Sequence, residues 1–212
     1  MTSLPNEYKP KVKICGMTNL EDALFCAHAG ADALGFIFYE QSPRYVSTSR
    51  AADIIRELPA YVIPVGVFVN EARDDIRRVT EKTGIRIIQL SGDEKPKECL
   101  GYGVKVWKAF RIRDLEEVES IGAYSIAAAM LDGAPEGKFG GSGVLPDYSV
   151  ACAMKEIHPV VLAGGLNPEN IIGAIQAVQP YAIDLSSGVE VYPGKKDHSK
   201  VQNLFEKIGR IG

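Results

Sequence analysis

A lysine and a cysteine stand two residues apart near the start of the chain, in the stretch KVKICGMT (residues 11–18). Side chains two apart on an extended strand share one face, so Lys13 and Cys15 point the same way, and Gly16 lets the chain turn directly afterwards. A nearby cation lowers the pKa of a thiol and makes the thiolate available as a base or nucleophile. The alternative is an inert buried cysteine, which is the commoner role of a single cysteine in a strand.

Two aspartates and an arginine also occur where short apolar segments end. Asp132 follows the run IAAAML, and a carboxylate there is costly to bury unless it is paired or used in chemistry, although it could also cap a loop. Asp184, in AIDLSSG, could orient a sugar hydroxyl or accept hydrogen bonds from backbone N–H groups. Arg44, in the loop QSPRYVS, could bind a carboxylate through two parallel hydrogen bonds or remain a solvated surface residue.

Two glycine-containing loops near the end of the chain indicate a phosphate site. LAGGLNPEN places Gly164 and Gly165 after an apolar strand pattern, and IDLSSGVE places Ser186, Ser187 and Gly188 after the next one. Glycine allows backbone N–H groups to approach phosphate oxygens closely. A single Gly-Gly pair is a weak signal, but two such loops at matching places after consecutive strands are a stronger one.

Eight short apolar segments alternate with helical patterns along the whole chain. The expected strands span residues 11–15, 33–38, 62–69, 85–90, 104–110, 126–132, 159–164 and 182–186. This alternation in 212 residues predicts a single-domain α/β fold, a (β/α)₈ TIM barrel over residues 1–212 with 1–10 as a short N-terminal extension. A doubly wound open sheet is the alternative. Active sites of such barrels lie at the carboxyl ends of the strands, where Cys15, Gln89 and Asp132 stand.

Helical patterns and one long loop connect these strands. Asn19 is expected to cap a helix that ends at Gly30, and Pro168 is expected in the first turn of a later helix. The stretch from Gly133 to Pro146 is too long for a plain connection. Loops of that length are usually functional lids or disordered, and a surface loop without a role is the alternative.

Composition and motifs exclude several classes of function. The formal net charge of −3 and the scattered basic residues predict no nucleic-acid partner, and no apolar run is long enough to predict a membrane span. Neither a disulfide framework, nor a metal site, nor a nucleotide-binding motif can be read from the sequence, which predicts a cytoplasmic protein. Three further cysteines fall in helical patterns and are expected to have no catalytic role: Cys26, Cys99 and Cys152.

Taken together, several segments resemble one known family. They are KICGMTNLEDALFCAHAGADALGFIFYEQSPRYVS, VGVFVN, IIQLSGDE, GGSG, LAGGLNPENI and DLSSGVEVYPGKKD, and they occur in the family's order from about residue 11 to the last helix. The sequence is similar to phosphoribosylanthranilate isomerases. The resemblance implies a TIM barrel that catalyses a cofactor-free Amadori rearrangement in tryptophan biosynthesis, converting N-(5-phosphoribosyl)anthranilate, an aminoaldose, into the corresponding 1-deoxyribulose phosphate.

The resemblance also implies roles for individual residues. Cys15 would be the general base that removes the C2′ proton, and Asp132 the general acid that protonates the furanose ring oxygen. Arg44 would hold the anthranilate carboxylate, and Asp184 would lie near the ribose hydroxyls. Gln89 is included among the substrate-binding residues, and the phosphate loops correspond to residues Gly164, Gly165, Ser186, Ser187 and Gly188.

One position departs from the family pattern, and two other functions stay open at this point. The family usually has histidine in a QLHG motif, where this chain has QLSG with Ser91. Because Cys15 and Asp132 are both retained, we interpret Ser91 as tuning the activity. The alternatives are the sister isomerisation of histidine biosynthesis, whose family uses an aspartate in place of Cys15, and a catalytically silent phosphate-binding barrel. The oligomeric state is expected to be monomer or homodimer.

Overall fold

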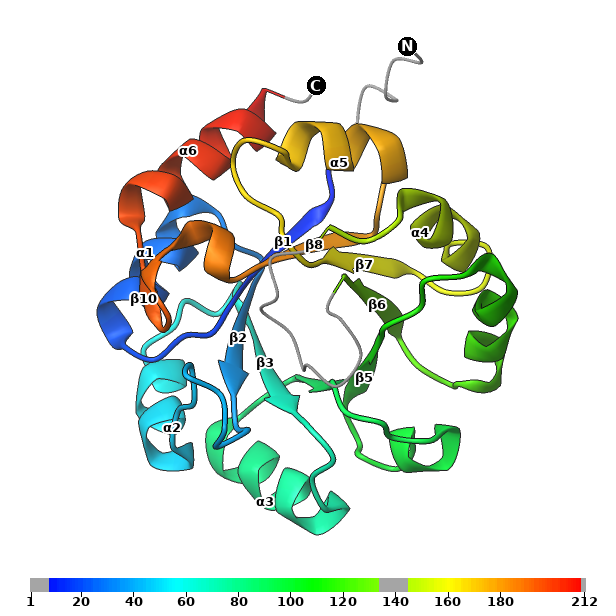
Figure 1. Cartoon of the computed structure of the whole chain (residues 1–212). Helices are drawn as coiled ribbons and strands as arrows, with labels where there is room; N and C mark the ends of the chain where they lie inside the picture. The colour runs from blue at the N-terminus through cyan, green and yellow to red at the C-terminus, as the bar shows by residue number, and fades with distance from the viewer. Residues whose placement is uncertain (1–7, 134–144, 211–212) are drawn as a thin grey trace.

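Eight parallel strands close into a barrel in the computed structural model, which describes residues 8–133 and 145–210 (Figure 1). Each strand pairs with the next, and β1 closes the barrel by pairing with β8. The strands are β1 Lys11–Cys15, β2 Ala33–Ile37, β3 Ile63–Phe68, β4 Ile87–Leu90, β5 Lys105–Phe110, β6 Ala128–Asp132, β7 Val160–Ala163 and β8 Ala182–Leu185. The predicted (β/α)₈ barrel is confirmed, and the open sheet is excluded because β1 and β8 are hydrogen-bonded to each other.

Helices surround the barrel, as Figure 1 shows. The α-helices are α1 Leu20–Ala29, α2 Thr48–Arg56, α3 Arg73–Thr83, α4 Tyr148–Met154, α5 Ile171–Val178 and α6 His198–Gly209. The remaining elements are three 3₁₀ helices, η1 Pro96–Cys99, η2 Leu115–Ala123 and η3 Ser187–Val189, and a short hairpin of β9 Glu190–Tyr192 and β10 Lys195–Lys196. After β4 and β5 the described connections therefore contain 3₁₀ helices in place of α-helices.

The predicted helix ends are partly correct. The Asn19 side chain accepts a hydrogen bond from the Asp22 N–H, and Gly30 ends α1 with a left-handed φ of 118°. Pro168 does not lie in the first turn of a helix, because it stands in a turn and α5 begins only at Ile171. Most of the long loop predicted from residue 133 to 146 lies outside the described residues, and the single-domain boundary stays a prediction.

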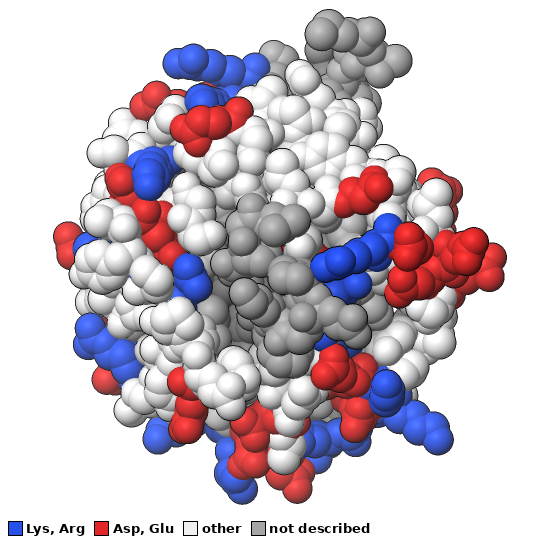
Figure 2. Space-filling model, in the orientation of Figure 1, with Lys and Arg blue, Asp and Glu red and all other residues white. Residues whose placement is uncertain are grey.

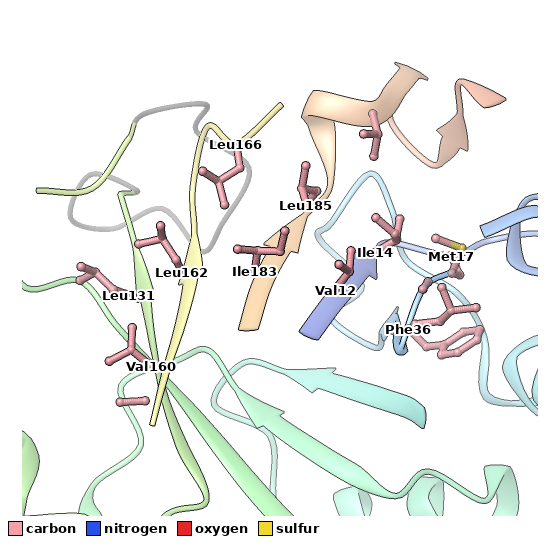
Figure 3. Packing of buried hydrophobic residues seen from close by; sticks show 14 of the residues in the cluster. Val12, Ile14, Met17, Phe36, Leu131, Val160, Leu162, Leu166, Ile183 and Leu185 are labelled. Carbon is pink, nitrogen blue, oxygen red and sulfur yellow. The ribbon is translucent and has the colours of Figure 1, made fainter. Parts of the chain in front are cut away.

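Alternation along each strand separates two layers of core residues. Val12 and Ile14 pack with Ile183 and Leu185 in the layer between barrel and helices (Figure 3). A second cluster fills the barrel interior, with Trp107 among its members. Successive side chains of a strand point to opposite faces. The residues that alternate with Val12 and Ile14 on β1, and with Ile183 and Leu185 on β8, therefore face the barrel interior. This alternation directs Lys13, Cys15 and Asp184 inward.

The outer surface carries both signs of charge. On the face shown in Figure 2, the described acidic and basic side chains are interspersed around the rim of the molecule, in keeping with the net charge of −3. None of the described helices combines the length and the apolar character that crossing a bilayer requires. The described residues also contain no cluster of three or more histidine, cysteine, aspartate or glutamate side chains suited to a metal ion.

Candidate active site

One cavity lies at the carboxyl ends of the barrel strands and brings most of the predicted site residues together. Nine of these residues line it: Cys15, Arg44, Gln89, Asp132, Gly164, Gly165, Asp184, Ser186 and Ser187. Gly188 is not part of the lining. The cavity wall also includes Tyr39, Ser42, Ser91 and Arg111, which were not predicted as binding residues. Parallel strands all end at the same rim, which is why residues distant in sequence meet here.

The lysine and aspartate beneath the thiol form a buried ion pair. Lys13 stands opposite Asp184 in the register of β1 and β8, and Lys13 Nζ lies 2.9 Å from Asp184 Oδ1. The side chain of Lys13 is 1% exposed and that of Asp184 is 9% exposed. Burial alone would lower the pKa of Lys13, but the charges of Asp184 and Cys15 raise it above its ordinary value. Lys13 therefore stays a cation inside the barrel.

The pKa of the Cys15 thiol is shifted in the direction opposite to the expected one. Burial raises its pKa above the ordinary value, and the charge of Lys13 acts in the opposite direction without reversing the shift. The expectation that the neighbouring lysine leaves Cys15 with a lowered pKa is therefore wrong, because the loss of water around the sulfur outweighs the attraction of the ammonium group. Lys13 limits the shift and stabilises the thiolate once it forms.

A glycine on the neighbouring strand makes room for this group. Gly35 pairs with Cys15 in the register of β1 and β2, and a β-carbon at Gly35 would lie 2.6 Å from Cys15 Sγ and 3.1 Å from Lys13 Cε. Both distances are below ordinary contact distances between carbon and its neighbours. Only glycine therefore leaves space for the thiol and the lysine stem at this point of the barrel.

Asp132 ends β6 and lines the cavity from another side. It pairs with Ala163 in the register of β6 and β7, so β7 and β8 separate it from the strand that carries Cys15. The thiol and this carboxylate thus border the same cavity from different strands. An acid and a base placed in this way can act on two different atoms of one bound molecule.

Arg44 reaches the same cavity from the loop after β2. Its guanidinium forms hydrogen bonds of 2.7 to 3.0 Å to the carboxylate of Glu190, and Glu190 also accepts a 2.8 Å hydrogen bond from Lys196 Nζ. A β-carbon at Gly16, which has a φ of 81°, would lie 2.7 Å from Arg44 Cδ. The positive φ and the close approach together require glycine directly after Cys15. Glu190 and Lys196 were not predicted as site residues.

The two predicted phosphate loops lie against each other. Gly164 and Gly165 have positive φ values of 86° and 61°, which only glycine adopts without strain. A β-carbon at Gly188 would lie 2.0 Å from the carbonyl oxygen of Leu166, so this glycine permits contact between the loops after β7 and β8. Asn170 Nδ2 donates to the Gly165 carbonyl at 2.9 Å and holds the first loop in place.

The end of β4 carries an amide with an unused acceptor. Gln89 Nε2 donates to Ser91 Oγ at 3.0 Å, and Arg111 Nη1 donates to the Ser91 carbonyl at 3.1 Å. Gln89 Oε1 is buried and has no hydrogen-bond partner among the described residues. A buried acceptor of this kind is costly unless a bound molecule supplies a donor. Ser91 thus acts as a hydrogen-bond partner of Gln89.

The position of the cavity defines the class of protein. In TIM barrels the active site is built at the carboxyl ends of the strands, while the opposite end serves stability. The ionisable side chains described above are gathered at the first of these two ends. The chain is therefore a TIM-barrel enzyme.

Comparisons with known proteins identify the family of this enzyme. The family model of N-(5'phosphoribosyl)anthranilate (PRA) isomerase matches residues 12–207. The N-(5'-phosphoribosyl)anthranilate isomerase of Citrifermentans bemidjiense is 47% identical over 201 residues, covering 95% of this chain and 98% of that protein. The chain belongs to the phosphoribosylanthranilate isomerase family and is an isomerase of tryptophan biosynthesis.

Solved structures agree with this assignment. The phosphoribosyl anthranilate isomerase of Thermotoga maritima superposes with a TM-score of 0.88 at 40% identity, covering 94% of this chain and 98% of that one. A second structure, with a TM-score of 0.84 at 39% identity and the same coverage, holds reduced 1-(o-carboxyphenylamino)-1-deoxyribulose 5-phosphate. A small phosphorylated molecule is therefore the kind of ligand that a relative of this chain binds.

Proposed function

We propose that Cys15 is the general base and Asp132 the general acid of a cofactor-free Amadori rearrangement of N-(5-phosphoribosyl)anthranilate. The observation that carries the proposal is the placement of the thiol and the carboxylate on different strands around one cavity. The arrangement also favours this reaction over the sister isomerisation of histidine biosynthesis, whose family has an aspartate where Cys15 stands.

The reaction begins with ring opening. Asp132 gives a proton to the furanose ring oxygen, the bond between C1′ and that oxygen breaks, and the lone pair of the anthranilate nitrogen forms a C1′=N⁺ double bond. The positive nitrogen acidifies the C2′ proton, so a base of modest strength is sufficient. The Cys15 thiolate removes this proton, and the electron pair moves to leave a neutral enolamine. Tautomerisation of the enolamine gives the ketone product without net gain or loss of protons.

The other residues are assigned by the groups of the substrate they suit. The loop of Gly164 and Gly165 and the loop of Ser186 and Ser187 hold the 5′-phosphate through backbone N–H groups, and Gly188 permits the contact between these two loops. Arg44 holds the anthranilate carboxylate, since a guanidinium binds a carboxylate with directed, charge-assisted hydrogen bonds. Asp184 lies near the ribose hydroxyls while keeping its ion pair with Lys13, and Gln89 offers its amide oxygen to a donor of the substrate.

Loss of anthranilate-type fluorescence measures the reaction directly. Wild type is mixed with phosphoribosylanthranilate generated in situ and compared with Cys15→Ser and Asp132→Asn. General acid–base groups contribute about 10²-fold or more to rate, so both variants should lose at least that factor. Cys152→Ser, at an exposed cysteine, and Asp53→Asn, at an exposed carboxylate, are the matched controls. Full activity in either site variant would contradict its assigned role.

The oligomeric state and the cellular location of the chain are two further predictions. One solved structure, 39% identical to this chain, is of mutually generated monomers of the dimeric isomerase of Thermotoga maritima. For this chain, monomer and homodimer are both predicted states. Analytical ultracentrifugation at assay concentration distinguishes the two states. The cytoplasmic location rests on the cysteine pattern of the sequence and stays a prediction.

A further inference from the structure

Three charged side chains form a buried cluster beside the cavity. The carboxylate of Glu190, on β9, lies between the guanidinium of Arg44 and the ammonium group of Lys196, on β10. Arg44 Nη2 is 2.7 Å from Glu190 Oε2, and Lys196 Nζ is 2.8 Å from Glu190 Oε1. The side chains of Arg44, Glu190 and Lys196 are 12%, 3% and 0% exposed. Charges this deeply buried are held in one arrangement by their partners.

The same cluster contacts the main chain of Cys15. Lys196 Nζ donates a 2.5 Å hydrogen bond to the Cys15 carbonyl oxygen, which also accepts a 3.2 Å hydrogen bond from Ser186 Oγ. The backbone N–H of Lys196 donates to Asp22 Oδ2 at 2.8 Å, which ties β10 to α1. Lys196 thus connects Glu190, which binds Arg44, to the end of β1, where the Cys15 thiol lies.

The pairing with Glu190 uses one edge of the Arg44 guanidinium. Nε and Nη2 donate to the carboxylate, and the hydrogens of Nη1 take no part in this pairing. A guanidinium is planar and carries five N–H donors, so a carboxylate bound at one edge fixes the plane and leaves the other edge for a second anion. Arg44 also lines the cavity. Its orientation toward the cavity is therefore set by Glu190.

We infer that Glu190 and Lys196 are positioning residues: Glu190 holds the Arg44 guanidinium in the orientation that receives the substrate carboxylate, and Lys196 fixes Glu190 relative to Cys15. The inference rests on the proposed function, because it concerns the carboxylate of the proposed substrate. On this inference, the β9–β10 hairpin sets the distance between the Arg44 guanidinium, which receives the carboxylate, and the Cys15 thiol, which takes the proton. A cluster that only stabilised the hairpin would not affect carboxylate recognition.

A charge-neutral double substitution separates the two roles. The cluster holds two cations and one anion, and Glu190→Gln with Lys196→Met removes one of each, so its net charge is unchanged. Replacing a buried ion pair as a whole is often tolerated, whereas removing one partner leaves an uncompensated charge. The exposed Lys11→Met, at the opposite end of β1, is the matched control for loss of a lysine ion pair.

The experiment compares two ligands by isothermal titration calorimetry. One is reduced 1-(o-carboxyphenylamino)-1-deoxyribulose 5-phosphate, and the other is the same compound without the benzoate carboxylate. Wild type and Lys11→Met should prefer the carboxylated ligand. The double variant should lose about tenfold or more of its affinity for that ligand, the scale of one charge-assisted hydrogen bond, while its affinity for the ligand without a carboxylate changes little. Steady-state kinetics should show the same loss mainly as a higher KM.

A folded double variant that keeps the full preference for the carboxylated ligand would overturn the inference. If the double variant does not fold, Glu190→Asp, which keeps the charge but shortens the side chain by one methylene, gives the same comparison: it should weaken carboxylate recognition, and an unchanged preference would overturn the inference. Wild type that binds both ligands equally would also refute it, while the proposed reaction would stand. Wild type that binds neither ligand would refute the proposed function together with this inference.

Discussion

Lys13 and Asp184 face each other across the seam between the first and last strands of the barrel, and their side chains form a 2.9 Å ion pair directly beneath the Cys15 thiol. The pair places a buried cation next to a thiol whose pKa burial raises. Without the lysine, ionisation of the thiol would be opposed by burial and by the charge of Asp184 together. This relationship links the closure of the barrel to the chemistry at its rim.

Replacing Lys13 tests the effect of the pair on the thiol. Lys13→Met should raise the apparent pKa of Cys15 further, so the rate of thiol alkylation by iodoacetamide should reach its plateau at higher pH than in wild type. Catalytic rate should fall at neutral pH because less thiolate is present. The substitution also leaves Asp184 without its partner and should lower the free energy of unfolding by about 3 kcal/mol or more. An alkylation profile identical to that of wild type would contradict the assigned role of Lys13.

Gly35→Ala tests the space around the thiol. The new β-carbon would lie 2.6 Å from Cys15 Sγ, so the thiol or β2 must move. Overpacking of this kind costs about 1–3 kcal/mol of stability, and kcat should fall because the thiol is displaced. Gly173→Ala is the control: it lies inside α5, nothing lies within 4 Å of the added carbon, and alanine should stabilise that helix. Equal kcat in both variants would show that the position of the thiol tolerates the added carbon.

The lowered pKa of Asp22 predicts how the free energy of unfolding changes with pH. Burial alone would raise the pKa of Asp22, but hydrogen bonds from Lys195 and Asn19, among others, lower it to about 2. A lowered pKa stabilises the folded state above the pKa of the unfolded chain, about 3.9. This contribution, on the order of 2 kcal/mol, should be lost as the pH falls from about 4 through 2.

Urea unfolding at two pH values measures this effect. Asp22→Asn should lower the free energy of unfolding at pH 7 and have a much smaller effect near pH 2, where the carboxylate is protonated in the unfolded chain and in about half of the folded molecules. Asp53→Asn removes an exposed pair with Arg56, in which the side chain of Asp53 is 63% exposed, and should change stability by less than about 1 kcal/mol. A pH-independent effect of Asp22→Asn would contradict the lowered pKa.

Gln89 and Ser91 predict two effects of different size. Gln89→Leu removes the buried acceptor offered to the substrate and should raise KM by about tenfold, the scale of one hydrogen bond to a charged or buried group. Ser91→Ala removes only the partner of the Gln89 amide nitrogen and should change kcat/KM less, which tests the interpretation of Ser91 as a tuning position. A larger loss in Ser91→Ala than in Gln89→Leu would show that the serine has a role of its own.

The barrel could be predicted from the sequence because it repeats one local pattern of strand and helix. Each predicted strand lies within two residues of the observed one at either end, since buried β-branched runs end at turn residues. The rim residues follow from the same pattern: Cys15, Gln89 and Asp132 stand at strand ends, and parallel strands all end on one side. The two glycine loops were recognisable because each follows an apolar strand pattern, and in the structure Gly164 and Gly165 of the first loop have positive φ values, where glycine is favoured.

Contacts between distant segments were decided by the tertiary structure alone. Glu190 pairs with Arg44 across 146 positions of sequence, and no local periodicity indicates that a hairpin near the end of the chain reaches the loop after β2. The direction of the Cys15 pKa shift also depends on the fold, because the spacing to Lys13 reveals a nearby cation but not the extent of burial. Strand identity is a local property of side-chain alternation, whereas ion pairing and desolvation depend on which segments the closed barrel brings together.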